Sequence, residues 1–271
     1  MNILDKILAH KAKEVAEKNS LVPVKLLEQS IYFDSKVVSL KKYVQDPEKS
    51  GIIAEFKRNS PSKGTINGSA SPEKVSIGYM QAGASALSIL TDKEFFGGSN
   101  EDLKTVRKFN YCPILRKDFV LEEYQIIEAK SIGADAILLI AAALEPQKLK
   151  SLAYFAKSLG LEVLMEVHDE EELDRSLCDG IDLVGVNNRN LKNFEVNIDT
   201  SLSLADKIPS SFVKVSESGI SKVESLIELK KAGFDGFLIG ENFMKTSRPE
   251  QAAYTFIKDF QRKLQAEKLN A

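Results

Sequence analysis

Eight short apolar segments recur along this chain of 271 residues, and each is followed by an amphipathic stretch of helical character. Continuous apolar runs of this length are typical of strands buried on both faces, as in parallel sheets. The feature therefore predicts helices packed outside a parallel β-sheet. The predicted strands cover residues 52–56, 86–90, 112–115, 136–140, 162–167, 183–186, 212–215 and 236–239.

The helical stretches between these strands carry ordinary start and stop signals. Several begin with proline in the first turn, as at Pro72 and Pro146, and several end at glycine, as at Gly83 and Gly133. The predicted helices cover 72–81, 100–108, 122–131, 146–158, 170–177, 199–207, 222–231 and 249–268.

Eight strand–helix units in about 220 residues fit a closed (β/α)8 barrel, the TIM barrel. An open doubly wound sheet is the alternative, but such a sheet usually carries a glycine-rich turn after its first strand. The chain contains neither GxGxxG nor GxxxxGK[ST], so the closed barrel is favoured.

The first fifty residues precede the barrel. We expect residues 1–50 to form a helical extension covering one end of it and residues 51–271 to form the barrel, with no linker, hence one structural domain. The apolar stripe over residues 3–18 predicts a helix that breaks at Asn19-Ser20, and Val22-Pro23 forbids its simple continuation. His10 lies on its charged side, which predicts a surface histidine.

Composition excludes several classes of function. The 37 Lys and Arg nearly balance the 39 Asp and Glu, so no global basic field attracts nucleic acid or an anionic membrane. Two cysteines and two histidines are too few for a Cys/His zinc site and predict free thiols in a reducing compartment. No apolar signal core or membrane-length run is present, so we expect a cytoplasmic protein.

Charged residues lie inside or next to the apolar runs, at the carboxyl ends where barrels of this class build active sites. These are Glu55, Lys57, Lys117, Glu166 and Glu217. Glu55 and Lys57 are two residues apart in a strand and would share one face. Together the group predicts acid–base chemistry on an anionic substrate. The alternative is structural, with edge lysines paired to glutamates.

The loops behind these strands add further candidates. Residues 60–64, Ser-Pro-Ser-Lys-Gly, read as a mobile lid. Phe95, Phe96 and Phe119 either pack on the rim or line a pocket for a flat ring. His168 is expected to cap or pack the helix after its strand.

An anion site is predicted at the far end of the rim. Arg189 beside Asn187 is suited to bidentate anion binding, and Ser218-Gly219 and Gly240 follow the last two strands, where phosphate commonly binds. A short helix at 242–245 would contribute its amino terminus, and Glu241 must point away from the anion.

These motifs resemble the signature of the indole-3-glycerol-phosphate synthases. The resemblance runs in order through most of the chain and is carried by IAEFKRNSPSKG (53–64), LSILTD (87–92), FFGGS (95–99), PILRKDF (113–119), LMEVH (164–168), GVNNRN (185–190), SESGI (216–220) and LIGE (238–241). It implies ring closure, decarboxylation and dehydration of 1-(2-carboxyphenylamino)-1-deoxyribulose 5-phosphate in tryptophan biosynthesis, without metal or organic cofactor.

The resemblance also implies roles for individual residues. Lys117 would be the general acid at the C2′ oxygen and Glu166 a proton acceptor, with Glu55 and Lys57 in support. Asn187, Glu217 and Ser60 would orient hydroxyls and the carboxylate. The phosphate end would comprise Arg189, Ser218, Gly219, Gly240 and the backbone of Glu241, and the apolar slot Leu90, Phe96, Phe119 and Leu138.

General acid catalysis by Lys117 leads us to expect a pKa lowered toward neutrality by burial or by Lys57. Two other functions stay open: a Schiff-base phosphosugar aldolase using Lys57 or Lys117, and a non-catalytic barrel that binds a phosphorylated metabolite. We expect a monomer, with a weak dimer as the alternative.

Overall fold

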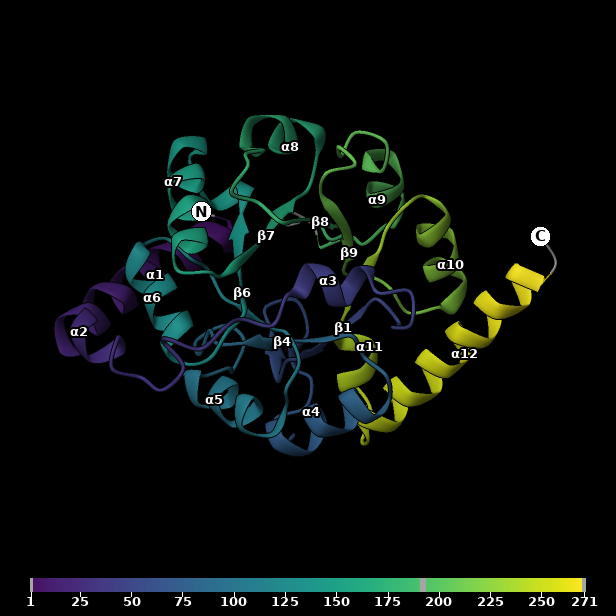
Figure 1. Ribbon diagram of the computed structural model, residues 1–271, viewed down its shortest axis with the longest axis horizontal. Coiled ribbons are helices and arrows are strands. Elements are labelled where there is room, and N and C mark those ends of the chain that lie inside the picture. The colour runs from purple at the N-terminus through teal and green to yellow at the C-terminus, as the bar shows by residue number, and fades with distance from the viewer. Residues whose placement is uncertain (1, 191–193, 270–271) are drawn as a thin grey trace.

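Eight parallel strands close into a barrel in this computed structural model, which describes residues 2–190 and 194–269. Helices surround the barrel (Figure 1). The prediction of a (β/α)8 barrel is confirmed. Around the barrel the strands run β1 (Ile52–Phe56), β4 (Ala86–Leu90), β5 (Ile114–Lys117), β6 (Ala136–Ile140), β7 (Glu162–Val167), β8 (Leu183–Asn187), β9 (Val213–Glu217) and β10 (Gly236–Ile239), and β10 pairs with β1.

The barrel helices alternate with the barrel strands along the sequence. Prolines begin three of them, at Pro72, Pro146 and Pro249. Side-chain oxygens of Ser71, Ser99 and Asp169 cap the amino ends of three, including the helix that begins at Pro72. The barrel helices are α4 (Pro72–Gln81), α5 (Asn100–Phe109), α6 (Glu123–Ser131), α7 (Pro146–Ser158), α8 (Glu170–Ser176), α9 (Asp199–Leu204), α10 (Val223–Lys231), α11 (Glu241–Met244) and α12 (Pro249–Leu269), with a 3-10 turn at Ala141–Ala143.

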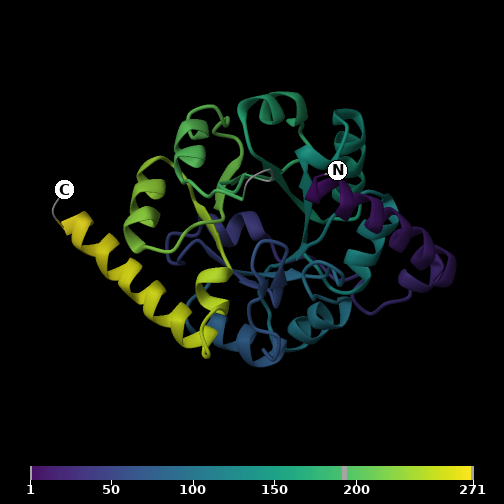
Figure 2. The ribbon, with the colours of Figure 1, turned by 180° about the vertical axis from the view of Figure 1, so that it is seen from behind.

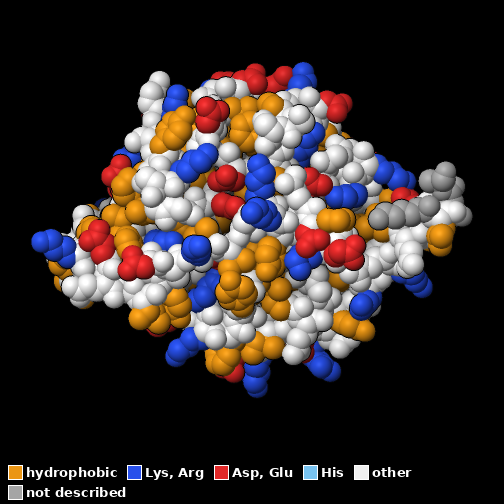
Figure 3. Space-filling model, in the orientation of Figure 1, with side chains coloured by type: hydrophobic (Ala, Val, Ile, Leu, Met, Phe, Trp, Pro, Cys, Tyr) orange, Lys and Arg blue, Asp and Glu red, His pale blue; other side chains and the backbone are white. Residues whose placement is uncertain are grey.

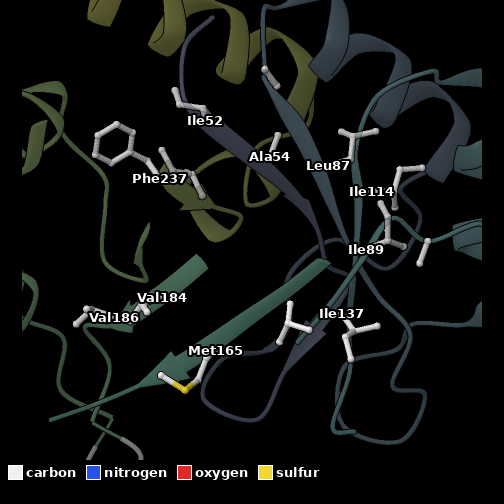
Figure 4. Close-up of a cluster of buried hydrophobic side chains, with 14 of the residues drawn as sticks. Ile52, Ala54, Leu87, Ile89, Ile114, Ile137, Met165, Val184, Val186 and Phe237 are labelled. Atoms are coloured by element: carbon white, nitrogen blue, oxygen red, sulfur yellow. The ribbon is translucent and has the colours of Figure 1, made fainter. Parts of the chain in front are cut away.

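Alternate residues of each strand serve two separate cores, because successive side chains point to opposite faces. Outward residues such as Ile52, Leu87 and Met165 pack under the helices (Figure 4). Inward residues such as Ile53 and Leu164 fill the barrel itself. Burial on both faces explains why the strands read as continuous apolar runs.

Two predicted strands were misplaced. β5 and β9 extend two residues beyond the predicted 112–115 and 212–215, and they begin later. Their last residues include Arg116, Lys117, Ser216 and Glu217, which are polar. A strand predicted from a run of apolar residues ends where polar residues begin. Here the polar side chains have partners inside the protein, so the strand continues.

The amino-terminal extension comprises α1 (Ile3–Leu21), α2 (Val24–Leu27) and α3 (Leu40–Gln45). It covers both ends of the barrel rather than one. Leu40 and Val44 of α3 join the barrel's interior core at one end (Figure 1), while α1 lies at the opposite end (Figure 2).

The predicted break of α1 at Asn19-Ser20 is wrong. The Ser20 hydroxyl donates to the Glu17 carbonyl at 2.7 Å, so the polar side chain is satisfied within the helix. The helix instead ends at Leu21, because the residue before Pro23 is disfavoured in helical conformation. His10 is exposed, as predicted, and its ring lies edge-on to Phe95.

A buried lysine anchors α1 to the barrel. The Lys11 ammonium lies 2.9 Å from Asp92 and 3.0 Å from Asp118, which follow β4 and β5, and only 1% of the residue is exposed. Burial alone would lower the pKa of Lys11, but the two carboxylates outweigh it and raise the pKa. The helix is therefore docked through a charged group that its amphipathic pattern did not reveal.

The face of the molecule shown in Figure 3 has, over its described residues, no region dominated by charges of one sign. Acidic and basic side chains are interspersed on it. Cys112 is a buried free thiol and Cys178 a half-buried one. Among the described residues no helix is both long and apolar enough to span a membrane.

Replacing Lys11 with alanine should lower the free energy of unfolding by about 3 kcal/mol, because two buried carboxylates lose their shared partner. Urea denaturation measures this change. Lys13→Ala, at an exposed position of the same helix, is the control and should change stability by less than about 0.5 kcal/mol. Equal effects of the two substitutions would contradict the anchor.

Candidate active site

A cavity of about 510 Å³ lies at the carboxyl ends of the strands. The structure brings together all the residues of the predicted site on its lining, though their individual chemical roles remain predictions. The lining includes Glu55, Lys57, Ser60, Leu90, Phe96, Lys117, Phe119, Leu138, Glu166, Asn187, Arg189, Glu217, Ser218, Gly219, Gly240 and Glu241.

Lys117, the last residue of β5, lies at the centre of the charged groups. Its ammonium donates to Glu166 of β7 at 2.9 Å and to Glu217 of β9 at 2.5 Å. Asn187, at the end of β8, donates to the other oxygen of Glu166 at 3.1 Å. Four strands thus place one connected polar network in the mouth of the barrel.

The expected lowering of the Lys117 pKa is not observed. Burial does oppose the charge, but the carboxylates of Glu166, Glu217 and Glu55 outweigh it and raise the pKa. Lys57 does not act as a second cation on Lys117, because its ammonium is paired with Glu55 at 2.7 Å. The Lys117 amine is therefore protonated at neutral pH and can donate a proton.

The two carboxyl groups that flank Lys117 differ in acidity. Burial disfavours the charge on both. For Glu166 the charges of Lys117 and His168 prevail, so its pKa is lowered to about 2. For Glu217 burial prevails over Lys117 and is reinforced by the charge of Glu166, which raises its pKa to about 7. Neighbouring carboxyl groups with separated pKa values are suited to different proton-transfer roles.

Two glycines make room for the carboxylates. A Cβ on Gly185 of β8 would lie 2.2 Å from a Glu217 oxygen, and one on Gly240 would lie 2.5 Å from a Glu55 oxygen. Real Cβ atoms do not approach oxygen so closely, so any larger residue at either position would displace a charged side chain. Gly185 was not singled out by the sequence, because a glycine inside an apolar run gives no signal of its own.

The segment predicted as a lid is more ordered than a plain loop. Asn59–Ser60 (β2) pairs with Gly64–Thr65 (β3) as a small antiparallel hairpin. Arg58 fastens its base by donating two hydrogen bonds to Asp102, at 2.6 and 2.9 Å. The hairpin and its turn line the cavity through Ser60, Pro61, Ser62 and Lys63. Its mobility stays a prediction.

An aromatic pair borders the same part of the cavity. The rings of Phe96 and Phe119 lie 6.0 Å apart, centre to centre, at an angle of 38°. Leu90 and Leu138 also line the cavity. This lining is apolar and suits a flat ring. Phe95 instead contacts His10.

The predicted anion end has its own geometry. Ser218 and Gly219 have φ of 69° and 74°, and a serine in the left-handed region is a strained residue of the kind that gathers at functional sites. Gly240 is the N-cap residue of the short helix α11. Glu241 does not point away from this end, because its carboxylate pairs with Arg189 at 3.4 Å.

Comparison with known proteins decides the family. The family model described as indole-3-glycerol phosphate synthase matches residues 4–256. The chain belongs to the indole-3-glycerol phosphate synthase family.

Relatives in this family match over nearly their whole length. A protein named indole-3-glycerol phosphate synthase from Bacteroides thetaiotaomicron is 48% identical over 96% of this chain and 99% of its own. One of the same name from Nautilia profundicola is 45% identical over 93% and 97%. A designed cube-shaped protein cage shares the fold alone, with a TM-score of 0.61, 16% identity and coverage of 81% and 75%.

This member of the synthase family also lines its cavity with residues that the sequence did not indicate. Ile3, Leu4 and Ile7 of α1 contribute, as do Phe194 and Val196. The apolar stripe of α1 predicted that Ile3, Leu4 and Ile7 share one packed face, but not that this face borders the cavity. Among the described residues, no cluster of three or more His, Cys, Asp or Glu side chains is arranged to hold a metal ion.

The raised pKa of Glu217 predicts a pH-dependent stability. A carboxyl group whose pKa rises from 4.5 to about 7 on folding stabilises the fold below pH 4.5, and that contribution is lost as pH rises through 7. Relative to Glu217→Gln, the wild-type enzyme should therefore lose at most about 3 kcal/mol of unfolding free energy across this range. Urea denaturation at a series of pH values measures the difference.

Glu123→Gln serves as control, because Glu123 is exposed on α6. Its stability difference from wild type should stay constant with pH. A constant difference for Glu217→Gln as well would show that Glu217 ionises as it does in the unfolded chain.

Proposed function

We propose that this chain catalyses the reaction for which its family is named. It would close the pyrrole ring of 1-(2-carboxyphenylamino)-1-deoxyribulose 5-phosphate, release CO2 and water, and yield indole-3-glycerol phosphate. The observation that carries the proposal is Lys117 held between Glu166 and Glu217 inside the cavity. An apolar slot and an anion end complete the cavity, matching an anilino ring and a phosphate.

Lys117 is the proposed general acid. Attack of the ring carbon on the C2′ carbonyl generates an alkoxide, which is basic enough to take a proton from an ammonium whose pKa is raised. The two carboxylates hold the ammonium in one position, so the place in the cavity at which it donates its proton is fixed. Loss of CO2 follows once the ring has lost its aromaticity, so no electron sink is required.

Glu166 is the proposed base in the dehydration. Its lowered pKa keeps it ionised at neutral pH, which is the form that accepts a proton. Glu217 is the better partner for a substrate hydroxyl, because a carboxyl group that titrates near neutrality can either donate or accept a hydrogen bond. Asn187 holds Glu166 in orientation.

Glu55 and Lys57 form the supporting pair. Their contact of 2.7 Å offsets much of the cost of burying both charges. We propose that Lys57 binds the substrate carboxylate before it leaves as CO2, while Glu55 orients the amine. Ser60 of the hairpin lines the same cavity and would hydrogen-bond the same substrate group.

Arg189, Ser218, Gly219, Gly240 and the backbone of Glu241 are the proposed phosphate site. The ion pair between Arg189 and Glu241 is partly exposed, with 21% and 36% of the side chains accessible, so an incoming phosphate competes for it in a well-solvated setting. Cytoplasmic location and a monomeric state remain our predictions for the whole protein.

Loss of the Lys117 amine should remove the chemical step. Lys117→Ala should lower kcat by about 10²–10⁴-fold, measured by the growth of indole fluorescence in the presence of a chelator. Lys108→Ala, at an exposed position of α5 outside the cavity, is the matched control and should change kcat far less. Near-wild-type turnover by Lys117→Ala would exclude Lys117 as the acid.

The same preparation distinguishes the other two functions. Borohydride added with substrate should leave no reduced adduct on a lysine, whereas an aldolase would be trapped covalently. A barrel that only binds phosphorylated metabolites would show no indole fluorescence from the wild-type protein.

Arg189→Ala should act on binding rather than on chemistry. It should raise KM about 10–100-fold, the equivalent of one or two charged hydrogen bonds, with little change in kcat. Glu241→Gln should not raise KM, because it removes a carboxylate from beside the phosphate and keeps the backbone N–H. A rise in KM for Glu241→Gln would show that the Glu241 side chain itself contacts substrate.

A further inference from the structure

His168 spans two carboxylates at the edge of the active site. Its Nδ1 lies 3.1 Å from Oε2 of Glu172, and its Nε2 lies 3.7 Å from Oε1 of Glu166. Nε2 is buried and has no hydrogen-bond partner within the described part of the chain. The ring is thus held at one nitrogen and faces the proposed base with the other. Neither the proposed reaction nor the family resemblance assigns it a task.

The local backbone fixes the ring in this position. Oε2 of Glu172 also accepts the backbone N–H of His168 at 2.8 Å, and Asp169 caps α8 by accepting the N–H of Glu172 at 2.8 Å. The expected capping role therefore belongs to Asp169. His168 is the residue just before the cap, and its side chain is free to connect α8 with the end of β7.

Charge favours the protonated ring. Burial opposes it, but Glu172, Glu166 and Glu217 face His168 and raise its pKa above the ordinary value. An imidazolium donates from both nitrogens. The protonated His168 ring can thus donate a proton toward Glu166.

Glu166 in turn connects His168 with Lys117. Its Oε1 is the oxygen nearest Nε2 of His168, and its Oε2 is the one bonded to the Lys117 ammonium. The side chains of Glu172 and His168 are 15% and 14% exposed, Glu166 is 6% exposed, and Lys117 is 13% exposed where it lines the cavity. These side chains form a continuous line of contacts whose outer end, Glu172, is partly exposed.

The chemistry of the proposed reaction requires such a line. The alkoxide formed in ring closure takes one proton, and the hydroxide that departs in dehydration takes a second. Only one proton is released, from the carbon next to C2′ as the indole forms. Because a substrate carboxylate leaves as neutral CO2, each turnover takes up one net proton from solvent.

We propose that Glu172, His168 and Glu166 are the path by which Lys117 is reprotonated from solvent between ring closure and dehydration; this rests on the proposed function. The Nε2–H bond of His168 breaks as an O–H bond forms at Oε1 of Glu166. A half-turn of the carboxyl group carries that proton to the neutral Lys117 amine. The neutral ring keeps its proton on Nδ1, so it turns about the Cβ–Cγ bond and its bare Nε2 takes a proton that Glu172 accepts from solvent.

The experiment compares variants that keep hydrogen bonds but cannot carry a proton. His168→Gln retains an N–H that reaches Glu166, and Glu172→Gln retains a polar partner for the ring. We expect His168→Gln to lower kcat about 10-fold or more at unchanged KM, and Glu172→Gln to lower it less. His10→Gln, at the other histidine of the chain, is the control and should match wild type.

Chemical rescue separates a proton path from a purely structural role. In His168→Ala, added imidazole should raise kcat in proportion to its concentration, and wild type should not respond. Absence of rescue, or a His168→Gln enzyme with wild-type kcat, would overturn the path. If the alanine variant fails to fold, Glu172→Gln provides the same test, because added imidazole should raise the kcat of Glu172→Gln as well. A wild-type protein without turnover would instead overturn the proposed function together with the path.

Discussion

Charge burial in the mouth of the barrel is the constraint on which the rest of this structure depends. Glu55, Glu166 and Glu217 are almost fully buried there and are balanced directly by Lys57 and Lys117. Any one of these groups alone would be costly to bury. They persist because each is paired, and because alternate strands of the barrel, β1, β5, β7 and β9, deliver them to the same end. The chemistry and the stability of this end of the barrel therefore depend on the same set of contacts.

A second ionic network lies behind the first, on the opposite face of the strand that carries Lys117. Arg116 is buried and paired with Glu128 of α6 at 2.5 Å and with Asp118 at 3.2 Å. Asp118 in turn receives Lys11 from α1. Successive residues of one strand end thus alternate between the helix layer and the cavity. The end of the strand that carries Lys117 is therefore held by ion pairs on both of its faces.

The sequence predicted the barrel because eight apolar runs at regular spacing leave few alternatives. It also predicted the rim residues, because a charged side chain such as Lys117 inside an apolar run is conspicuous. It could not predict properties that depend on neighbours far along the chain. The direction of the Lys117 pKa required knowing that Glu166 and Glu217 both touch it. Likewise, the partner of Lys11 could not be inferred from a helix pattern that places lysine among exposed residues.

The anchoring of α1 makes the extension a part of the site rather than an appendage. Ile3, Leu4 and Ile7 form cavity wall, and Lys11 locks that wall to the loops after β4 and β5. For protein engineering, residues 11, 92 and 118 therefore form one set, because replacing the lysine alone takes a shared cation from two buried carboxylates. A recombinant that joins this barrel to a foreign amino-terminal helix has to match all three positions.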